Sequence, residues 1–224
     1  MNDRWFECAA VLFDLDGTLV DSTKVVGRIW GEWARRQGLD PDWVMHIAHG
    51  QRTYDSVKIV APYLTVEEQH QAFKDIEGRE IVETDGLVVF EGGKQLLESL
   101  PPNRWTIVTS GTRLLAEARL RAAGLPVPGR MITADDVENG KPHPEPYLKG
   151  AEILGVAPET CIVIEDAPSG IRSAQAASMK AIAIPTTYAI QDLQHADVIA
   201  PDLASLSAIA SNGVIRLTVR GPLH

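Results

Sequence analysis

Near its N-terminus the chain reads Val11-Leu12-Phe13-Asp14-Leu15-Asp16-Gly17-Thr18, an apolar run that stops at two aspartates. The continuous apolar run over residues 9–13 is typical of a strand buried on both faces of a parallel sheet. Asp14 would then leave the carboxyl end of the strand, which is the edge where open α/β sheets bind ligands. Gly17 can turn sharply and leave backbone amides free for an anion. The stretch therefore predicts a ligand site directly after the first buried strand.

The two aspartates of this stretch suit magnesium and phosphoryl chemistry. Hard dications prefer oxygen ligands, and an ionised carboxylate can attack phosphorus to give an aspartyl-phosphate. A neighbouring carboxylic acid can protonate the departing alcohol. An ordinary acidic turn after a strand is equally compatible with this sequence, so residues elsewhere in the chain must distinguish the two interpretations.

The composition is that of a globular protein with a sizeable core. The chain has 224 residues, of which 45% are hydrophobic, and a formal net charge of -9. This acidity argues against a nucleic-acid backbone or an anionic membrane surface as the main partner, although bound Mg2+ can reverse the local field. Cys8 and Cys161 lie in apolar, strand-like runs and are expected to be core thiols. Because no secretory core and no apolar run of about 20 residues is present, we expect a cytoplasmic protein.

The chain divides into two stretches with different secondary-structure patterns. Residues 21–88 are helical throughout, with a capping box at Thr65-Val66-Glu67-Glu68 that opens the last helix. After Glu91, helices alternate with short apolar strands, which we expect at residues 105–109, 131–133, 161–164 and 181–184. Residues 214–219 look like an added edge strand.

The predicted fold class is α/β, with a doubly wound parallel sheet and an all-helical insertion after the first strand. Residues 1–20 and 89–224 would form the core, and residues 21–88 would form the insertion. Hinges are expected near residues 20–21 and 88–92.

Three later segments place polar groups where this core would end its strands. Thr109, Ser110 and Gly111 follow one strand and can either donate hydrogen bonds to phosphate oxygens or cap a helix. The loop Lys141-Pro142-His143-Pro144 can aim its lysine at the acidic loop or leave it solvated. Glu165-Asp166 can complete a divalent-ion site or form a second acidic turn. The convergence of four such segments favours a phosphoryl-transfer site.

Taken in order, these segments resemble the four motifs of the haloacid dehalogenase superfamily of phosphatases. The likeness is greatest to the sugar and polyol phosphatases, including glycerol-3-phosphatases and 2-deoxyglucose-6-phosphate phosphatases. It extends through residues 49–55, 109–113, 132–137, 140–144 and 165–170. The resemblance implies a Mg2+-dependent phosphatase with a Rossmann-like core, which hydrolyses a small phosphomonoester through an aspartyl-phosphate.

The resemblance also assigns roles to individual residues. Asp14 would be the nucleophile and a Mg2+ ligand, and Asp16 the general acid and base, with its backbone carbonyl on the metal. Asp166 would bind the metal directly, and Glu165 directly or through water. The phosphate-binding groups are implied to be Leu15, Thr109, Ser110, Gly111 and Lys141, and Lys141 is implied to be catalytic as well.

The helical insertion would, by the same resemblance, be a cap that closes over the core and selects the leaving group. His49, Arg52 and Asp55 are the candidates for contacting a polyol, with Lys24 as a further candidate. A structural histidine, a solvated arginine, and an aspartate that serves as a cap or ion-pair partner are the alternatives for the first three.

Several other functions share parts of this pattern. A β-phosphoglucomutase-like mutase has all four motifs, and a non-catalytic regulatory or binding protein on this scaffold is the non-enzymatic alternative. A phosphonatase would need a lysine in the loop of residues 50–52, and a haloacid dehalogenase lacks the second aspartate that Asp16 provides. Gly93-Lys94-Gln95 lacks the earlier glycine and the Ser/Thr of a P-loop. The expected partner is a small phosphorylated substrate of unidentified structure, and a monomer is favoured without direct evidence.

Overall fold

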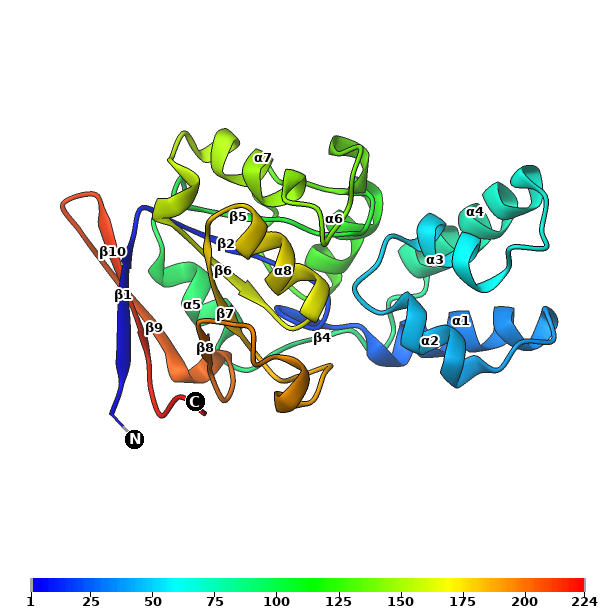
Figure 1. Cartoon of the computed structure of the whole chain (residues 1–224), viewed down its shortest axis with the longest axis horizontal. Helices are drawn as coiled ribbons and strands as arrows, with labels where there is room; N and C mark the ends of the chain where they lie inside the picture. Colours follow the sequence, from blue (N-terminus) through cyan, green and yellow to red (C-terminus); the bar gives the residue numbers. More distant parts are fainter. Residues whose placement is uncertain (1, 224) are drawn as a thin grey trace.

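A parallel sheet of five strands forms the centre of the computed structural model, which describes residues 2–223 (Figure 1). The strand order is β5-β2-β6-β7-β8. The strands are β2 (Ala10–Phe13), β5 (Trp105–Ile107), β6 (Cys161–Glu165), β7 (Lys180–Ala183) and β8 (Val198–Ile199). Because β2 lies between β5 and β6, the residues that follow these three strands meet at one edge of the sheet.

Helices cover both faces of this sheet. They are α5 (Gly93–Ser99), α6 (Arg113–Ala122), α7 (Glu145–Leu154) and α8 (Pro168–Ala176). Val11 and Phe13 of β2 pack in one apolar cluster with α5 and α6, whereas Ala10 and Leu12 pack in another with α7 and α8. The alternation explains why β2 is apolar at every position, and it confirms the predicted doubly wound α/β fold.

One predicted strand is reduced in the structure. Residues 131–133 form only an isolated bridge between Val108 and Ile132. Short helical turns complete the connections: η1 (Ala134–Asp136), η2 (Pro158–Thr160), η3 (Ile190–Asp192) and η4 (Leu203–Ser205).

Four helices lie between β2 and the rest of the core, and we call them the helical insert (residues 23–82). They are α1 (Thr23–Arg36), α2 (Pro41–Ala48), α3 (Thr53–Val60) and α4 (Val66–Val82). The predicted capping box is present, since the Thr65 hydroxyl accepts from the amide of Glu68 and the Glu68 carboxylate accepts from the amide of Thr65. An apolar cluster that includes Ile29, Trp33 and Ile76 holds the four helices together.

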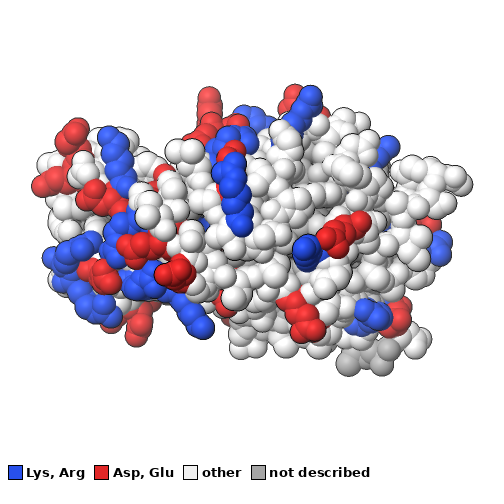
Figure 2. Space-filling view, turned by 180° about the vertical axis from the view of Figure 1, so that it is seen from behind, with Lys and Arg blue, Asp and Glu red and all other residues white. Residues whose placement is uncertain are grey.

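The insert is connected to the core by a short antiparallel ribbon of two strands, β3 (Val20–Asp21) and β4 (Val88–Val89). Figure 1 shows the insert at one end of the molecule, beyond the carboxyl edge of the central sheet. Figure 2 shows that acidic and basic side chains intermingle on the surface of the insert, at the left of that view.

A second sheet lies at the opposite end of the molecule and corrects one prediction (Figure 1). The C-terminal strand β10 (Val214–Val219) is not an edge strand. It is the middle strand of an antiparallel sheet, between β1 (Arg4–Cys8) and β9 (Leu206–Ser211). Asn212 and Gly213 both have positive φ, which suits a tight hairpin between β9 and β10. We missed this Asn-Gly signal in the sequence.

Two further predictions concern the thiols and the membrane. Cys8 and Cys161 are free and buried, as expected, and burial is the main cause that raises their pKa values to about 12 and about 11. Among residues 2–223, no helix combines the length and apolar character needed to cross a membrane.

Candidate active site

Lys141 lies at the centre of a buried charge network at the carboxyl edge of the sheet. Its Nζ donates to Asp14 Oδ1 at 2.6 Å, to Glu165 Oε1 at 2.7 Å and to the carbonyl of Val108 at 3.0 Å. Lys141, Asp14 and Glu165 are 6%, 7% and 1% exposed. Burial disfavours the charged lysine, but the two carboxylates outweigh this cost and raise the pKa of Lys141 well above its usual value. The structure therefore brings the loop lysine to the acidic loop.

Side chains of α7 and α8 form hydrogen bonds with the loop that carries Lys141. The Glu145 carboxylate accepts from the amides of Glu138 and Asn139, at 2.9 Å each. These hydrogen bonds stabilise the ionised carboxylate and lower the pKa of Glu145 to about 2. At the other end of the loop, the carbonyl of His143 accepts from the hydroxyl of Ser173 at 2.6 Å. The lysine is thus placed by a fixed segment.

Three carboxylates converge beside this lysine. Asp14, Glu165 and Asp166 offer oxygen atoms that all lie within 4.8 Å of one another. Burial, followed by the charge of Glu165, raises the pKa of Asp166 to about 7. Burial also raises the pKa of Asp14, where Glu165 and Asp166 add to the effect and Lys141 opposes it. One lysine does not balance three buried carboxylates, so the cluster fits an oxygen-seeking dication such as Mg2+.

The hydrogen bonds of Glu165 separate its role from those of the two aspartates. Its Oε1 accepts from Lys141 and from the hydroxyl of Tyr147 at 2.9 Å, and its Oε2 accepts from the amides of Asp166 and Ala167. Four donors occupy this carboxylate, whereas Asp14 accepts from Lys141 and Asp166 accepts from Thr18 at 3.3 Å. Asp14 and Asp166 therefore have more acceptor positions free for a cation than Glu165 has.

Glycine is required where the acidic loops approach one another. Gly17 has a φ of +85°, and a Cβ atom there would lie 2.1 Å from Asp166 Oδ2. A Cβ atom on Gly170 would lie 1.6 Å from Glu165 Oε1. Neither distance is possible without moving a carboxylate of the cluster, so both glycines are needed for its geometry.

The other predicted phosphate-binding residues lie at the same edge. The buried Thr109 hydroxyl accepts from the amide of Gly111 at 3.1 Å. Ser110 donates to the carbonyl of Gly50 at 3.1 Å, which connects this loop to the helical insert. The Leu15 side chain is fully buried in the core, so only its backbone can contact a ligand.

A cavity lies between this edge and the helical insert. Its core wall includes Asp14, Asp16, Gly17, Thr109, Ser110, Gly111, Arg119 and Asp166. Its insert wall includes Val26, Trp30, His49, Gln51, Thr53 and Glu80. A molecule bound there would contact the charged edge and the insert at once.

Of the four insert residues that we singled out from the sequence, His49 lines the cavity. Its Nε2 is buried and, among the residues described, has no hydrogen-bond partner. Burial, followed by the charge of His46, lowers the pKa of His49 and favours the neutral ring. A neutral imidazole nitrogen is suited to a hydroxyl group.

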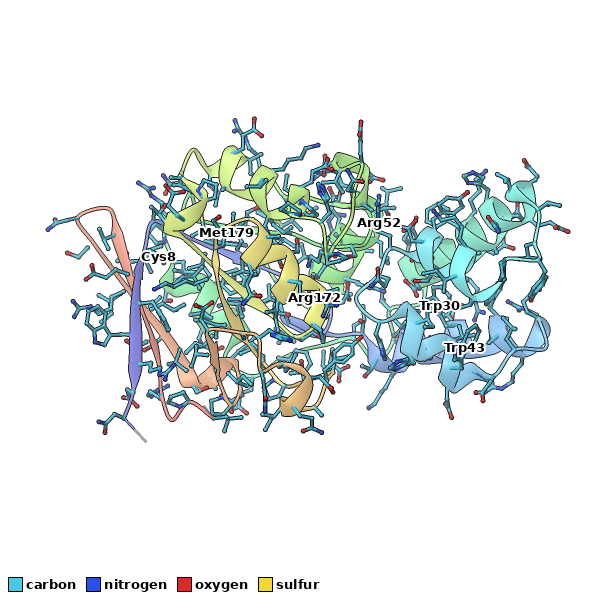
Figure 3. The ribbon with its side chains drawn as sticks, in the orientation of Figure 1. Cys8, Trp30, Trp43, Arg52, Arg172 and Met179 are labelled. Carbon is cyan, nitrogen blue, oxygen red and sulfur yellow. The ribbon has the colours of Figure 1, made fainter. Side chains whose placement is uncertain are left out.

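The other three insert residues lie outside the cavity wall. Arg52 pairs with Asp55 at 3.0 Å and donates to the carbonyl of Glu138 at 2.9 Å. Figure 3 shows Arg52 at the boundary between the insert and the core. Asp55 also pairs with Lys58 at 2.7 Å, and Lys24 is exposed. Arg52 therefore holds the insert against the loop that leads to Lys141.

We did not predict the roles of Arg119, Glu80, Trp30 and Tyr147 from the sequence. One signal was present: Arg119 follows Leu115 and Ala116 at helical spacing, which puts a charge on the buried face of α6. A charged residue on such a face is rarely buried without a partner. Arg119 is 5% exposed and donates both to Asp16 and to Glu80.

Comparisons with known proteins identify the family of the chain. The sequence model of the family described as haloacid dehalogenase-like hydrolase matches residues 8–178. Hexitol phosphatase A of Escherichia coli is 40% identical over 202 residues, which cover 89% of this chain and 94% of that protein. Glycerol-1-phosphate phosphohydrolase 1 of Saccharomyces cerevisiae is 35% identical, over 83% of this chain and 78% of that protein.

A solved structure extends the comparison to the fold. A hydrolase from Pseudomonas syringae superimposes with a TM-score of 0.79 at 26% identity, over 87% of this chain and 94% of that one. The family expected from the four sequence motifs is thereby confirmed. The chain belongs to the haloacid dehalogenase-like hydrolases.

Proposed function

We propose that this protein is a Mg2+-dependent phosphatase that hydrolyses a small sugar or polyol phosphate through an aspartyl-phosphate on Asp14. The observation that carries the proposal is the contact of Lys141 with Asp14, within a buried cluster of three carboxylates. Such a cluster attracts a dication, and the lysine and the dication together would let a carboxylate approach a phosphate. The relatives named for hexitol and glycerol phosphates support the substrate class.

In the proposed reaction, Asp14 is the nucleophile and Asp16 is the general acid and base. An oxygen of Asp14 attacks phosphorus, and the bond from phosphorus to the substrate alcohol breaks. Asp16 gives its proton to the departing oxygen. Asp16 then takes a proton from water, which attacks the aspartyl-phosphate, releases inorganic phosphate and restores Asp14.

The surrounding residues hold the phosphoryl group during both steps. Lys141 neutralises its charge, while Thr109, Ser110 and Gly111 offer hydrogen bonds. Mg2+ held by Asp14, Asp166 and the backbone carbonyl of Asp16 would supply positive charge opposite the phosphoryl oxygens. Lys141 also favours the ionised state that Asp14 needs as a nucleophile, against the effect of burial.

We further propose that residues 21–88 are a cap domain on a core of residues 1–20 and 89–224. The insert forms one wall of the cavity through Trp30, His49 and Gln51. The alcohol part of the substrate would lie against this wall, where the neutral ring of His49 can hydrogen-bond a hydroxyl group. The insert thus selects the substrate, and the core performs the chemistry.

A phosphate-release screen tests the proposal. The purified protein would be incubated with Mg2+ and with sugar, polyol and nucleotide phosphates and a phosphonate, with the Asp14→Asn variant as control. We expect turnover of small sugar or polyol phosphates by the wild type and none by the variant. Absence of wild-type turnover, or near wild-type turnover by Asp14→Asn, would refute it. Conversion of a sugar 1-phosphate to its 6-phosphate without phosphate release would identify a mutase instead.

A further inference from the structure

Arg119 connects the predicted general acid to the helical insert. It projects from α6 and is 5% exposed. Its Nη1 donates to Asp16 Oδ2, and its Nη2 donates to Glu80 Oε2 at 2.8 Å. Asp16 belongs to the core and Glu80 belongs to α4, so a single guanidinium spans the two parts of the molecule. The two carboxylates outweigh burial and raise the pKa of Arg119, which therefore stays charged.

The insert holds this arginine from more than one direction. Glu80 Oε1 accepts from the indole Nε1 of Trp30 at 3.0 Å, which fixes the carboxylate that Arg119 contacts. One helical turn earlier on α4, Glu77 lies near both Arg119 and Thr112, the N-cap residue of α6. A planar guanidinium engages each carboxylate through a different nitrogen, and a lysine at this position has only one nitrogen to share.

The contact with Arg119 divides the two oxygens of Asp16. Oδ2 is bound to Arg119, while Oδ1 is buried and, in the described part of the chain, without a hydrogen-bond partner. Asp16 also lines the cavity. The arginine therefore fixes one edge of the carboxyl group, and Oδ1 has no competing donor among the described residues.

We propose that Arg119 is a positioning residue for Asp16 and that Glu80 of the insert sets the position of Arg119. The inference rests on the proposed phosphatase function. The insert then contributes to proton transfer as well as to substrate selection. The simpler alternative is that Arg119 only neutralises buried Glu80 and stabilises the boundary between α4 and α6.

A comparison of leaving groups separates these two roles. An alkyl phosphate such as glycerol phosphate needs a proton on its departing oxygen, whereas 4-nitrophenolate leaves without one. In Arg119→Met we expect kcat/KM to fall about 100-fold for the alkyl phosphate and less than about threefold for 4-nitrophenyl phosphate. Arg119→Lys should also lose the alkyl substrate selectively, because a single ammonium nitrogen cannot occupy both positions at which Nη1 and Nη2 now meet Asp16 and Glu80.

Arg121→Met is the matched control. Arg121 lies on the same helix, is exposed and pairs with Glu117 at 2.7 Å. Its replacement should leave both kcat/KM values within about twofold of the wild type. Circular dichroism and thermal unfolding would verify that each variant is folded.

A double variant tests the structural alternative. Arg119→Met combined with Glu80→Gln removes the buried cation and its buried anion together, so no unpaired charge remains on Glu80. If Arg119 only neutralises Glu80, this variant recovers wild-type kinetics, and the proposal is overturned. We expect the selective loss of the alkyl substrate to persist. Glu83→Gln, also on the C-terminal side of α4, is the control for the glutamate.

The outcomes also separate this inference from the proposed function. A wild type that turns over neither substrate would overturn both. An active wild type with an equal loss for the two leaving groups in Arg119→Met, or with no loss, would overturn the positioning role alone.

Discussion

The charge network of Lys141, Asp14 and Glu165, which reaches the core wall of the cavity through Asp14, holds its groups in short contacts, whereas the insert wall leaves a neutral polar atom unpaired. Lys141 has three partners within 3.0 Å, and Glu165 accepts from four donors. On the opposite wall, the Nε2 of His49 has no partner among the residues described. A buried charge must be paired to persist, but a neutral group that awaits a ligand can stay unpaired at smaller cost. The comparison supports our proposal that the core performs the chemistry and the insert recognises the substrate.

The largest expected effect comes from removing Lys141 from the buried charge network. Lys141→Met would leave Asp14 and Glu165 buried without their cation, so we expect the free energy of unfolding to fall by about 3–5 kcal/mol. The kcat should fall by about 10³-fold, because the phosphoryl group loses its fixed positive charge. Urea unfolding and steady-state kinetics measure the two effects.

Lys94→Met provides the reference for this change. Lys94 is exposed and lies 4.0 Å from Glu98, so its loss should alter neither stability nor turnover appreciably. A Lys141→Met variant as stable as this control would contradict our account of the buried charge network.

The second effect concerns metal and pH. Without metal, folded Asp166 keeps its proton up to a pKa of about 7, whereas the unfolded chain loses it near 3.8. The folded state thus binds more protons between these values, so the unfolding temperature of the metal-free protein should fall as the pH rises from 5 to 8. Mg2+ should raise it more at pH 8 than at pH 5, because it binds the ionised carboxylate.

Asp166→Asn removes the titrating group from the same cluster. Thermal melts in EDTA and in Mg2+ should then show a flatter pH dependence and a smaller stabilisation by the metal. An unchanged Mg2+ effect in this variant would exclude Asp166 as a ligand.

A smaller effect should follow from changing the insert wall. His49→Ala removes the unpaired ring nitrogen, and we expect KM for the preferred polyol or sugar phosphate to rise about three- to tenfold, as for one hydrogen bond. The kcat should change less, because the core is intact. His46→Ala, on the exposed side of α2, is the control, and an equal rise in KM there would argue against a contact between His49 and the substrate.

The smallest effects are expected at Lys24 and Asp55. Lys24 is exposed, and Asp55 pairs with Arg52 and Lys58 outside the cavity wall. Lys24→Ala and Asp55→Asn should therefore leave kcat/KM within about twofold of the wild type. A loss of tenfold or more in either variant would show that the bound substrate reaches beyond the cavity wall described here.

The site residues that were predicted from the sequence either follow a strand directly or lie in a loop with a recognisable short motif. Asp14, Thr109 and Glu165 are placed by the parallel order of β5, β2 and β6, so a strand pattern alone brings them together. Lys141 and His49 do not follow strands, and it is the short motifs around them that predict their roles.

Contacts between helices were harder to predict. Arg119 and Glu80 are 39 residues apart, on helices of different parts of the molecule, and no local spacing connects them. Whether Arg52 faces a ligand or the loop at Glu138 depends on how the insert packs against the core. The sequence of α3 does not specify this packing. The position of β10 depended on its pairing with a strand at the other end of the chain.

The ribbon of β3 and β4 has a consequence for protein engineering. Asp21 pairs with Val88, so the two points where the chain enters and leaves the insert are neighbours on adjacent strands. A foreign segment whose own ends are equally close can be joined at these points without altering the order of the central sheet. The ribbon is therefore a natural crossover point for chimeras, in which the insert of one relative on the core of another would test whether the insert carries the substrate range.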